Sequence, residues 1–169
     1  MAADIVAKNS LLSADAALRR IRRMAYEVAE RNVDTTELVL LGIEGNGTVV
    51  ATQLSKELKG ILPAAIEQGV IRIDKKNPVN ASLDAGLSLD GKVVLVVDDV
   101  SNTGRTLLYA LKPLLSVLPK TIQTLVLVER AHKLFAVQPD FVGLSVSTTL
   151  QEHITVETDG SSITGAFLH

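Results

Sequence analysis

Two consecutive carboxylates, Asp98 and Asp99, directly follow an aliphatic run at 93–97, in which four of the five residues are β-branched. A run of this kind predicts a strand that is buried on both faces of a parallel sheet. Because ligands of open α/β sheets bind outside the carboxyl ends of the strands, we expect both carboxylates at a binding crevice. Carboxylates suit hydrogen bonds from sugar hydroxyls, or a divalent cation that is held beside phosphate groups.

A polar loop follows the carboxylates and leads into a mostly apolar helix that is predicted over 104–115. A loop that enters a helix N-terminus directs several unpaired backbone N–H groups at one point, which favours a phosphate. The loop and the start of this helix consist of Val100, Ser101, Asn102, Thr103, Gly104, Arg105 and Thr106. Carboxylates beside such a loop predict a phosphorylated sugar as the ligand.

Other interpretations of this stretch are open to test. An Asp pair that closes a strand can be a solvated turn. The segment 95–99 also looks like the first strand of a phospho-accepting receiver domain, but such a pair lies near the start of its domain, and here only 70 residues follow Asp99. A Walker A loop is excluded because no Gly-Lys-Ser/Thr follows. The whole stretch 93–106 favours the sugar phosphate.

A second strand-to-helix turn consists of Glu44, Gly45, Asn46 and Gly47, between a strand predicted over 37–43 and a helix predicted over 48–59. A glycine-rich turn lets the backbone approach an anion closely. The turn is not a full dinucleotide fingerprint, because Val50 stands at the third glycine position. It is either a second anion site or an ordinary tight turn.

The remaining pattern predicts a helix from the N-cap Ser13 to about residue 32, strands over 121–129, 141–146 and 154–157, and an irregular C-terminus. Residues 64–74 alternate weakly around Gln68-Gly69, which predicts two short strands or a hairpin. The first helix carries Arg19, Arg20, Arg22 and Arg23 on its polar face. We expect these arginines to pair with Glu27 and Glu30, the alternative being an anionic partner or a subunit interface.

Residues 74–90 are rich in turn formers, and a loop of this length inside a compact domain is usually functional or disordered. Arg130 and His132 follow the strand predicted over 121–129, at the same edge as the carboxylates if the strands are parallel.

The length, composition and charge of the chain exclude several classes of protein. At 169 residues the chain is expected to form one domain, over 1–169. The absence of cysteine excludes disulfides and thiolate chemistry. No apolar run is long enough to span a bilayer and no export signal is visible, so we expect no membrane contact and a cytoplasmic location. The net charge of -2 and an aromatic content of 3% predict that any RNA binding is weak.

The strand, the Asp98-Asp99 pair and the loop ending in Thr103-Gly104-Arg105-Thr106 closely resemble the phosphoribosyl-diphosphate signature of type I phosphoribosyltransferases. Segments 40–43, 128–132 and 139–143 also occur in the order seen in pyrimidine-operon attenuation regulators with uracil phosphoribosyltransferase activity. The resemblance implies an α/β fold with an open, mostly parallel sheet flanked by helices. It also implies a small C-terminal hood, from about residue 130 onward together with the N-terminal segment, and a mobile lid over about 74–90.

The resemblance also implies roles for particular residues. Asp98 and Asp99 would hold the ribose hydroxyls, with Mg²⁺ carried by the substrate beside them, and Arg130 would join them in catalysis. Residues from Ser101 to Thr106 would wrap the 5′-phosphate. The turn 44–47 would face the pyrophosphate. The lid residues would be Arg72, Asp74, Lys75 and Lys76, and the base pocket would consist of Arg130, His132, Phe141 and Val142.

The expected reaction transfers ribose 5-phosphate from phosphoribosyl diphosphate to uracil, or to another pyrimidine or purine base, with release of pyrophosphate in nucleotide salvage. A homodimer or higher homo-oligomer is expected. The competing hypothesis is a regulator of the same fold that binds a nucleotide or phosphoribosyl diphosphate, and RNA, with little or no catalysis. The turn favours this hypothesis in one respect, because it carries Glu44 where the resembling subfamily usually has basic residues.

Overall fold

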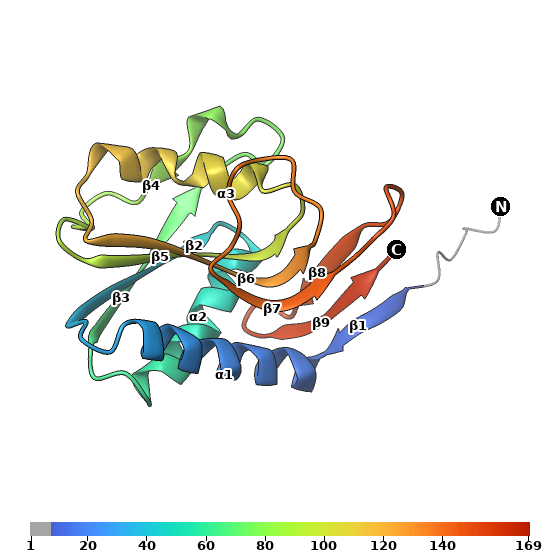
Figure 1. Ribbon diagram of the computed structural model, residues 1–169, viewed down its shortest axis with the longest axis horizontal. Helices are drawn as coiled ribbons and strands as arrows, with labels where there is room; N and C mark the ends of the chain where they lie inside the picture. Colours follow the sequence, from blue (N-terminus) through green and yellow to red (C-terminus); the bar gives the residue numbers. More distant parts are fainter. Residues whose placement is uncertain (1–7) are drawn as a thin grey trace.

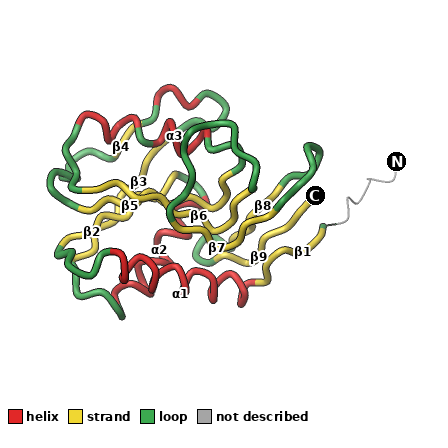
Figure 2. The backbone as a smooth tube through the Cα atoms, viewed as in Figure 1, coloured by secondary structure: helices red, strands yellow, loops and turns green. Residues whose placement is uncertain are grey.

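A six-stranded sheet forms the centre of the molecule in the computed structural model, which describes residues 8–169 (Figures 1 and 2). Its strand order is β4-β3-β2-β5-β6-β7, and every neighbouring pair is parallel except β3 with β4. The strands are β2 (Glu37–Ile43), β3 (Ala65–Arg72), β4 (Ser82–Leu83), β5 (Val93–Ser101), β6 (Thr121–Arg130) and β7 (Phe141–Val146). The predicted open, mostly parallel α/β sheet is therefore confirmed.

Helices cover both faces of this sheet, as the aliphatic character of its central strands requires. Helices α1 (Ala14–Arg31) and α2 (Asn46–Lys59) lie on one face, and α3 (Arg105–Ala110) with the short 3-10 helices η1 (Pro78–Asn80) and η2 (Lys112–Ser116) lies on the other (Figure 1). Alternate residues of each strand enter opposite cores. Leu95 packs in the core beneath α1 and α2, whereas Val94 and Val96 pack in the core beneath α3.

A second sheet lies beside the larger one and contains β1 (Asn9–Ser13), β8 (Ile154–Thr158) and β9 (Ile163–Leu168) in the antiparallel order β1-β9-β8 (Figure 1). We name it the hood sheet. The prediction of an irregular C-terminus was wrong, because β9 pairs with both β1 and β8. The segment 130–146 does not contribute a strand to the hood sheet, since β7 belongs to the larger sheet.

The predicted pair of short strands over 64–74 was also wrong. Residues Ala65–Arg72 form one strand, which pairs with β2 from Glu37 to Ile43 without a break. Gly69 interrupts the apolar pattern, but a Cβ at this position would lie 2.6 Å from the Leu87 side chain. The glycine therefore makes room for packing, and pairing with a buried neighbour outweighs its weak intrinsic strand propensity.

Boundaries of three other elements differ from the prediction. Strand β5 continues through Ser101, so both carboxylates lie inside the strand rather than after it. Helix α2 begins at Asn46 instead of residue 48, which makes Asn46 and Gly47 part of the helix. Helix α3 ends at Ala110, and Pro113 lies in η2, as expected for a residue that cannot continue an α-helix.

The arginines of α1 hold the helix onto the sheet edge. Arg23 pairs with Glu27, as predicted, and also donates a hydrogen bond of 2.7 Å to the carbonyl of Gly143 in β7. Arg20 donates to the same carbonyl at 3.3 Å. Within residues 8–169 no arginine pairs with Glu30. Because β7 is an edge strand, these guanidinium groups satisfy carbonyls that would otherwise have no strand partner.

A membrane-spanning segment is absent from the helices of the described chain, since none of them combines the length and the apolar character that crossing requires.

Alanine at Gly143 should lower the free energy of unfolding by about 1–3 kcal/mol, because its Cβ would lie 2.3 Å from the backbone oxygen of Leu127. Gly60→Ala is the matched control. Gly60 has right-handed dihedrals, φ -83° and ψ -15°, and a Cβ there would meet nothing closer than 3.5 Å. It should be neutral or stabilising by about 0.4–1 kcal/mol. Urea unfolding compares the two, and equal losses would contradict this account of Gly143.

Candidate active site

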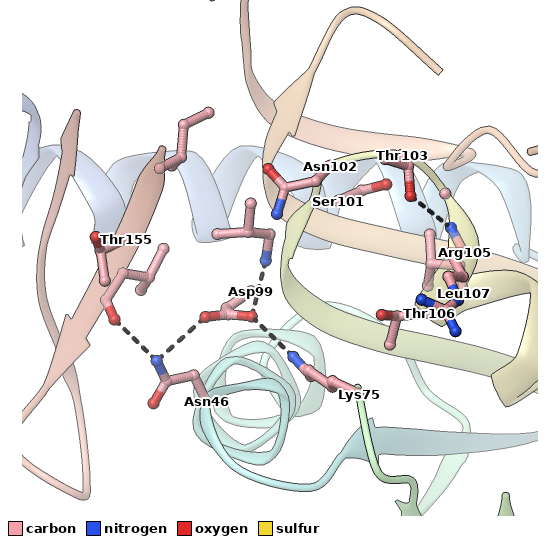
Figure 3. Close-up of a pocket in the computed structure, with 14 residues that line it drawn as sticks. Asn46, Lys75, Asp99, Ser101, Asn102, Thr103, Arg105, Thr106, Leu107 and Thr155 are labelled. Carbon is pink, nitrogen blue, oxygen red and sulfur yellow. Dashed lines mark hydrogen bonds and ion pairs between the residues drawn. The ribbon is translucent and has the colours of Figure 1, made fainter. Parts of the chain in front are cut away.

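A pocket of about 230 Å³ lies at the carboxyl end of β5, between the larger sheet and the hood sheet (Figure 3). Strand β8 closes one side, and the loop between β5 and α3 closes the other. The lining residues are Asn46, Lys75, Asp99, Val100, Ser101, Asn102, Thr103, Gly104, Arg105, Thr106, Leu107, Ile154, Thr155 and Val156. The structure thus brings the predicted phosphate loop, one residue of the 44–47 turn and one lid residue together around Asp99.

The two carboxylates are held by the backbone of their own strand. Asp98 Oδ1 accepts a hydrogen bond from the Asp99 N–H at 2.9 Å, and Asp99 Oδ1 accepts one from the Val100 N–H at 2.8 Å. Asp98 is 1% exposed, whereas Asp99 is 8% exposed and reaches the pocket. Both groups are therefore fixed in direction before any ligand arrives, which suits recognition of a sugar.

A lysine from the segment after β3 contacts both carboxyl groups of this pair. Lys75 Nζ lies 3.4 Å from each carboxylate oxygen of Asp98 and 3.8 Å from Asp99 Oδ1 (Figure 3 shows the contact with Asp99). Burial nevertheless raises the pKa of Asp98 above its ordinary value, and the neighbouring charge of Asp99 raises it further. The attraction of Lys75 acts in the opposite direction but does not cancel these two effects.

Asn46 connects three elements at the pocket. Its side-chain amide donates to Asp99 Oδ2 at 3.1 Å and to the backbone carbonyl of Val156 at 2.8 Å, so it joins α2, β5 and β8 (Figure 3). The next residue, Gly47, allows this approach, because a Cβ there would lie 2.8 Å from the carbonyl oxygen of Val97. The glycine-rich turn thus brings the start of α2 against the carboxylates.

The phosphate loop, Ser101–Thr106, is shaped by a glycine and by a buried lysine behind it. Gly104 has φ +87°, and a Cβ there would lie 2.8 Å from the carbonyl oxygen of Val137. Lys133 Nζ donates to the carbonyls of Arg130 at 2.8 Å and Ser101 at 3.3 Å, and pairs with Glu129 at 3.3 Å. Burial lowers the pKa of this lysine. The sequence interpretation missed Lys133, which supports the loop from outside the pocket.

One side-chain oxygen in the loop is available for a hydrogen bond with a ligand. The hydroxyl of Ser101 is buried and has no hydrogen-bond partner among residues 8–169. Buried polar groups are nearly always paired, so an orphan hydroxyl in a pocket wall is a position where a ligand oxygen fits. Ser101 lines the pocket together with Asn102, Thr103 and Gly104, and successive backbone N–H groups of such a loop can form an anion-binding concavity.

Several predicted site residues lie outside this pocket. Glu44 is exposed at the turn and pairs with Arg72 at 3.7 Å, and Arg72 also pairs with Asp84. Asp74 accepts the backbone N–H of Lys76 at 2.9 Å instead of facing the carboxylates. Of the predicted pyrophosphate and lid residues, only Asn46 and Lys75 line the pocket.

The residues predicted to form a base pocket do not gather here. Arg130 donates to the carbonyl of Thr149, and His132 is exposed. Phe141 is buried in the core under α1, with the Arg31 guanidinium 5.5 Å from its ring. Phe141 begins β7 at the end farther from the carboxyl edge, and Val142 follows it. In place of these four residues, Ile154, Thr155 and Val156 of the hood sheet face the pocket.

The carboxylates fit a divalent cation only with help from a ligand. No cluster of three or more His, Cys, Asp or Glu side chains suited to a metal occurs within the described part of the chain. Asp98 and Asp99 alone supply fewer oxygens than the six that Mg²⁺ prefers. Oxygens of a sugar diphosphate would complete the shell, so these residues suit a cation that enters with its substrate.

Comparison with known proteins agrees with this geometry. The chain matches the phosphoribosyl transferase domain family over residues 8–159. It is 35% identical to the bifunctional protein PyrR of Pelotomaculum thermopropionicum over 166 residues, which covers 90% of this chain and 92% of that protein. It is also 35% identical to the bifunctional protein PyrR of Synechocystis sp. over 167 residues, covering 92% and 91%. The resemblance found in the sequence is confirmed.

Solved structures show the same fold. The hypoxanthine phosphoribosyltransferase of Trypanosoma cruzi superposes with a TM-score of 0.80 at 18% identity and covers 96% of both chains. A hypoxanthine-guanine phosphoribosyltransferase from Bacillus anthracis superposes with a TM-score of 0.72 at 19% identity, over 87% of this chain and 85% of that one.

The raised pKa of the buried Asp98 makes the stability of the ligand-free protein depend on pH. Between the ordinary pKa of an aspartate and the raised pKa of Asp98, the unfolded chain releases its proton first, so stability falls as pH rises. Asp98→Asn lacks this titration and should be more stable than the wild type by about 1–3 kcal/mol at about pH 8, with the difference shrinking towards about pH 4.

Chemical denaturation at both pH values measures the effect of this substitution. Asp34→Asn, at an exposed aspartate beyond α1, is the control and should change stability by less than about 0.5 kcal/mol at either pH. An Asp98→Asn protein that is less stable than the wild type at the higher pH would show that the carboxylate stabilises the fold.

Proposed function

Since this chain belongs to the phosphoribosyltransferase family, we propose that its pocket binds phosphoribosyl diphosphate and transfers the ribose 5-phosphate group to uracil. The observation that carries the proposal is that Asp99 and the phosphate loop line the same pocket. A ribose hydroxyl and a 5′-phosphate require such a pair of groups, one that accepts hydrogen bonds and one that donates them.

Each part of the substrate has a counterpart in the pocket. The ribose hydroxyls would donate to Asp99 and Asp98, and the 5′-phosphate would lie in the loop Ser101–Thr106. Mg²⁺ bound with the diphosphate would offset its negative charge beside the two carboxylates. The base would lie against Ile154–Val156 of the hood sheet, where apolar side chains and backbone groups face the pocket.

A bond would form between a ring nitrogen of the base and C1 of the ribose as the bond from C1 to the pyrophosphate oxygen breaks, and the proton of that nitrogen would pass to the departing pyrophosphate or to solvent. No protein nucleophile is needed, because the leaving group departs from a sugar whose positive charge the neighbouring oxygens share. The chain would contribute orientation and charge, with the fixed carboxylates holding the ribose and the loop holding its phosphate. A lid formed by residues 74–90 would exclude water from the reacting carbon.

Uracil is proposed as the base for two reasons. The relatives that are similar over nine tenths of the chain are named bifunctional protein PyrR. Segments 40–43 and 128–132 also resemble pyrimidine-operon regulators with uracil phosphoribosyltransferase activity. The solved purine-specific structures share the fold at 18–19% identity and carry no weight on the choice of base.

A regulatory role with slow turnover is the second candidate, and one observation favours it. The turn that should face pyrophosphate carries the exposed Glu44, and the nearby Arg72 is already paired with Glu44 and Asp84. A pocket that holds the ribose 5-phosphate well but the leaving group poorly would bind its ligand without rapid transfer. Turnover with uracil, hypoxanthine and guanine, measured beside ligand binding, separates the two candidates.

Phosphoribosyl diphosphate with Mg²⁺ should stabilise the protein by about 2.7 kcal/mol at a hundred times its dissociation constant. The double variant Asp98→Asn, Asp99→Asn should lose this thermal shift and the turnover with uracil while it stays folded, because it cannot accept the ribose hydroxyls as strongly. Asp34→Asn should retain both. A double variant that keeps the full shift would disprove the assignment of the carboxylates.

Binding should also protect the segment after β3 from hydrogen exchange. We expect the gain at 74–81, because Ser82–Leu83 already pairs with β3 and Leu89 is already buried in the free protein. Amides of β5 provide the internal reference, since they are hydrogen-bonded in both states. Strong and equal protection of 74–81 with and without ligand would exclude a lid.

A further inference from the structure

Lys75 occupies the side of the carboxylate pair at which a substrate would enter. Its ammonium group lies 3.4 Å from both oxygens of Asp98 and 3.8 Å from Asp99 Oδ1, while its side chain is 47% exposed and lines the pocket. It is the one ionic link from segment 74–77 to β5 among residues 8–169.

Other cations of the same region cannot take this position in the free protein. Arg72 is held by Asp84 and Glu44 on the far side of the turn. Lys76 is exposed and does not line the pocket, and Arg105 lies on the opposite wall, in the phosphate loop. Lys75 is therefore the cation that offsets the two buried carboxylates, which would otherwise repel each other at close range.

A divalent cation on these oxygens would lie close to the ammonium group of Lys75. The distances place the ammonium within direct ionic contact of both carboxylates, so a second cation on the same oxygens would meet strong repulsion in a partly buried site. We propose that Lys75 is a built-in counter-ion that keeps a free divalent cation off Asp98 and Asp99 and yields only to a cation carried by the sugar diphosphate. This inference rests on the proposed function.

The replacement of Lys75 by a substrate-bound cation has a direct consequence for the specificity of the site. Lys75 must leave the carboxylates before the ribose hydroxyls can reach them, and the negative diphosphate offers the displaced ammonium a new partner. The turn beside it supplies no cation of its own, since Glu44 is acidic and Asn46 is neutral. Lys75 is therefore a specificity-determining residue that favours a metal-bound diphosphate over the metal alone.

Mn²⁺ is the probe that tests the proposal, because its free form is counted directly by electron paramagnetic resonance. The titration uses ligand-free protein, so it needs neither substrate nor turnover. Wild type and Lys75→Arg should bind Mn²⁺ weakly and equally. Lys75→Met should bind it at least about tenfold more tightly, because the carboxylates are then uncompensated. Lys76→Met is the matched control for loss of a positive charge from the same segment, and should behave as the wild type.

A further variant locates the binding. Adding Asp98→Asn and Asp99→Asn to Lys75→Met should abolish the gain. Lys75→Gln provides a second neutral side chain, and circular dichroism verifies the fold of each variant. Equal Mn²⁺ affinity in wild type, Lys75→Met and Lys75→Gln would overturn the proposal, as would an equal gain in Lys76→Met or a gain that survives without the carboxylates.

The Mn²⁺ titration and the thermal shift with phosphoribosyl diphosphate together distinguish failure of this inference from failure of the proposed function. If phosphoribosyl diphosphate does not bind but Lys75→Met gains Mn²⁺ affinity, the competition stands and the substrate assignment is wrong. If phosphoribosyl diphosphate binds through the carboxylates but no neutral variant gains Mn²⁺, the substrate assignment stands and Lys75 has no counter-ion role.

Discussion

Two adjacent carboxylates inside a buried strand are the constraint around which this protein is built. A charge removed from water is costly unless it is paired or hydrogen-bonded, and here two like charges are neighbours. Several parts of the fold meet this cost together. The strand supplies its own N–H groups, α2 contributes the amide of Asn46, and the segment after β3 contributes Lys75. The elements that compensate the pair are the same elements that enclose the pocket.

The sequence predicted the elements whose signal is local. Strands β2, β5 and β6 are aliphatic runs that are buried on both faces, so their composition identifies them without knowledge of their neighbours. The position of the loop at 101–106 beside the pocket was also predicted, because its glycine and hydroxyl residues come at the end of the strand and directly after it. Strands β1 and β9 were missed because their evidence is non-local. Asn9 pairs with Leu168, and nothing within either short segment indicates a partner so far away in the sequence.

For the site, too, the sequence identified some of the residues and missed others. Arg130 and His132 were selected because charged residues at a strand end commonly serve a ligand. The residue that matters structurally is the next lysine, Lys133, which folds back onto the carbonyls of Arg130 and Ser101. A sequence identifies the end of a strand, but not which side chain turns inward. The pocket wall formed by Ile154–Val156 was not predicted for another reason, because only the hood sheet brings these residues to β5.

The order β1-β9-β8 has a consequence for how the protein is made. Strand β8 forms a wall of the pocket, yet its partner β9 ends at Leu168, and β9 in turn pairs with β1 at the other end of the described chain. During synthesis the six-stranded sheet can assemble from residues already released by the ribosome, whereas the wall of the pocket waits until β9 has emerged. Contacts between such distant residues are slow to form. The nascent protein therefore acquires its scaffold before its pocket.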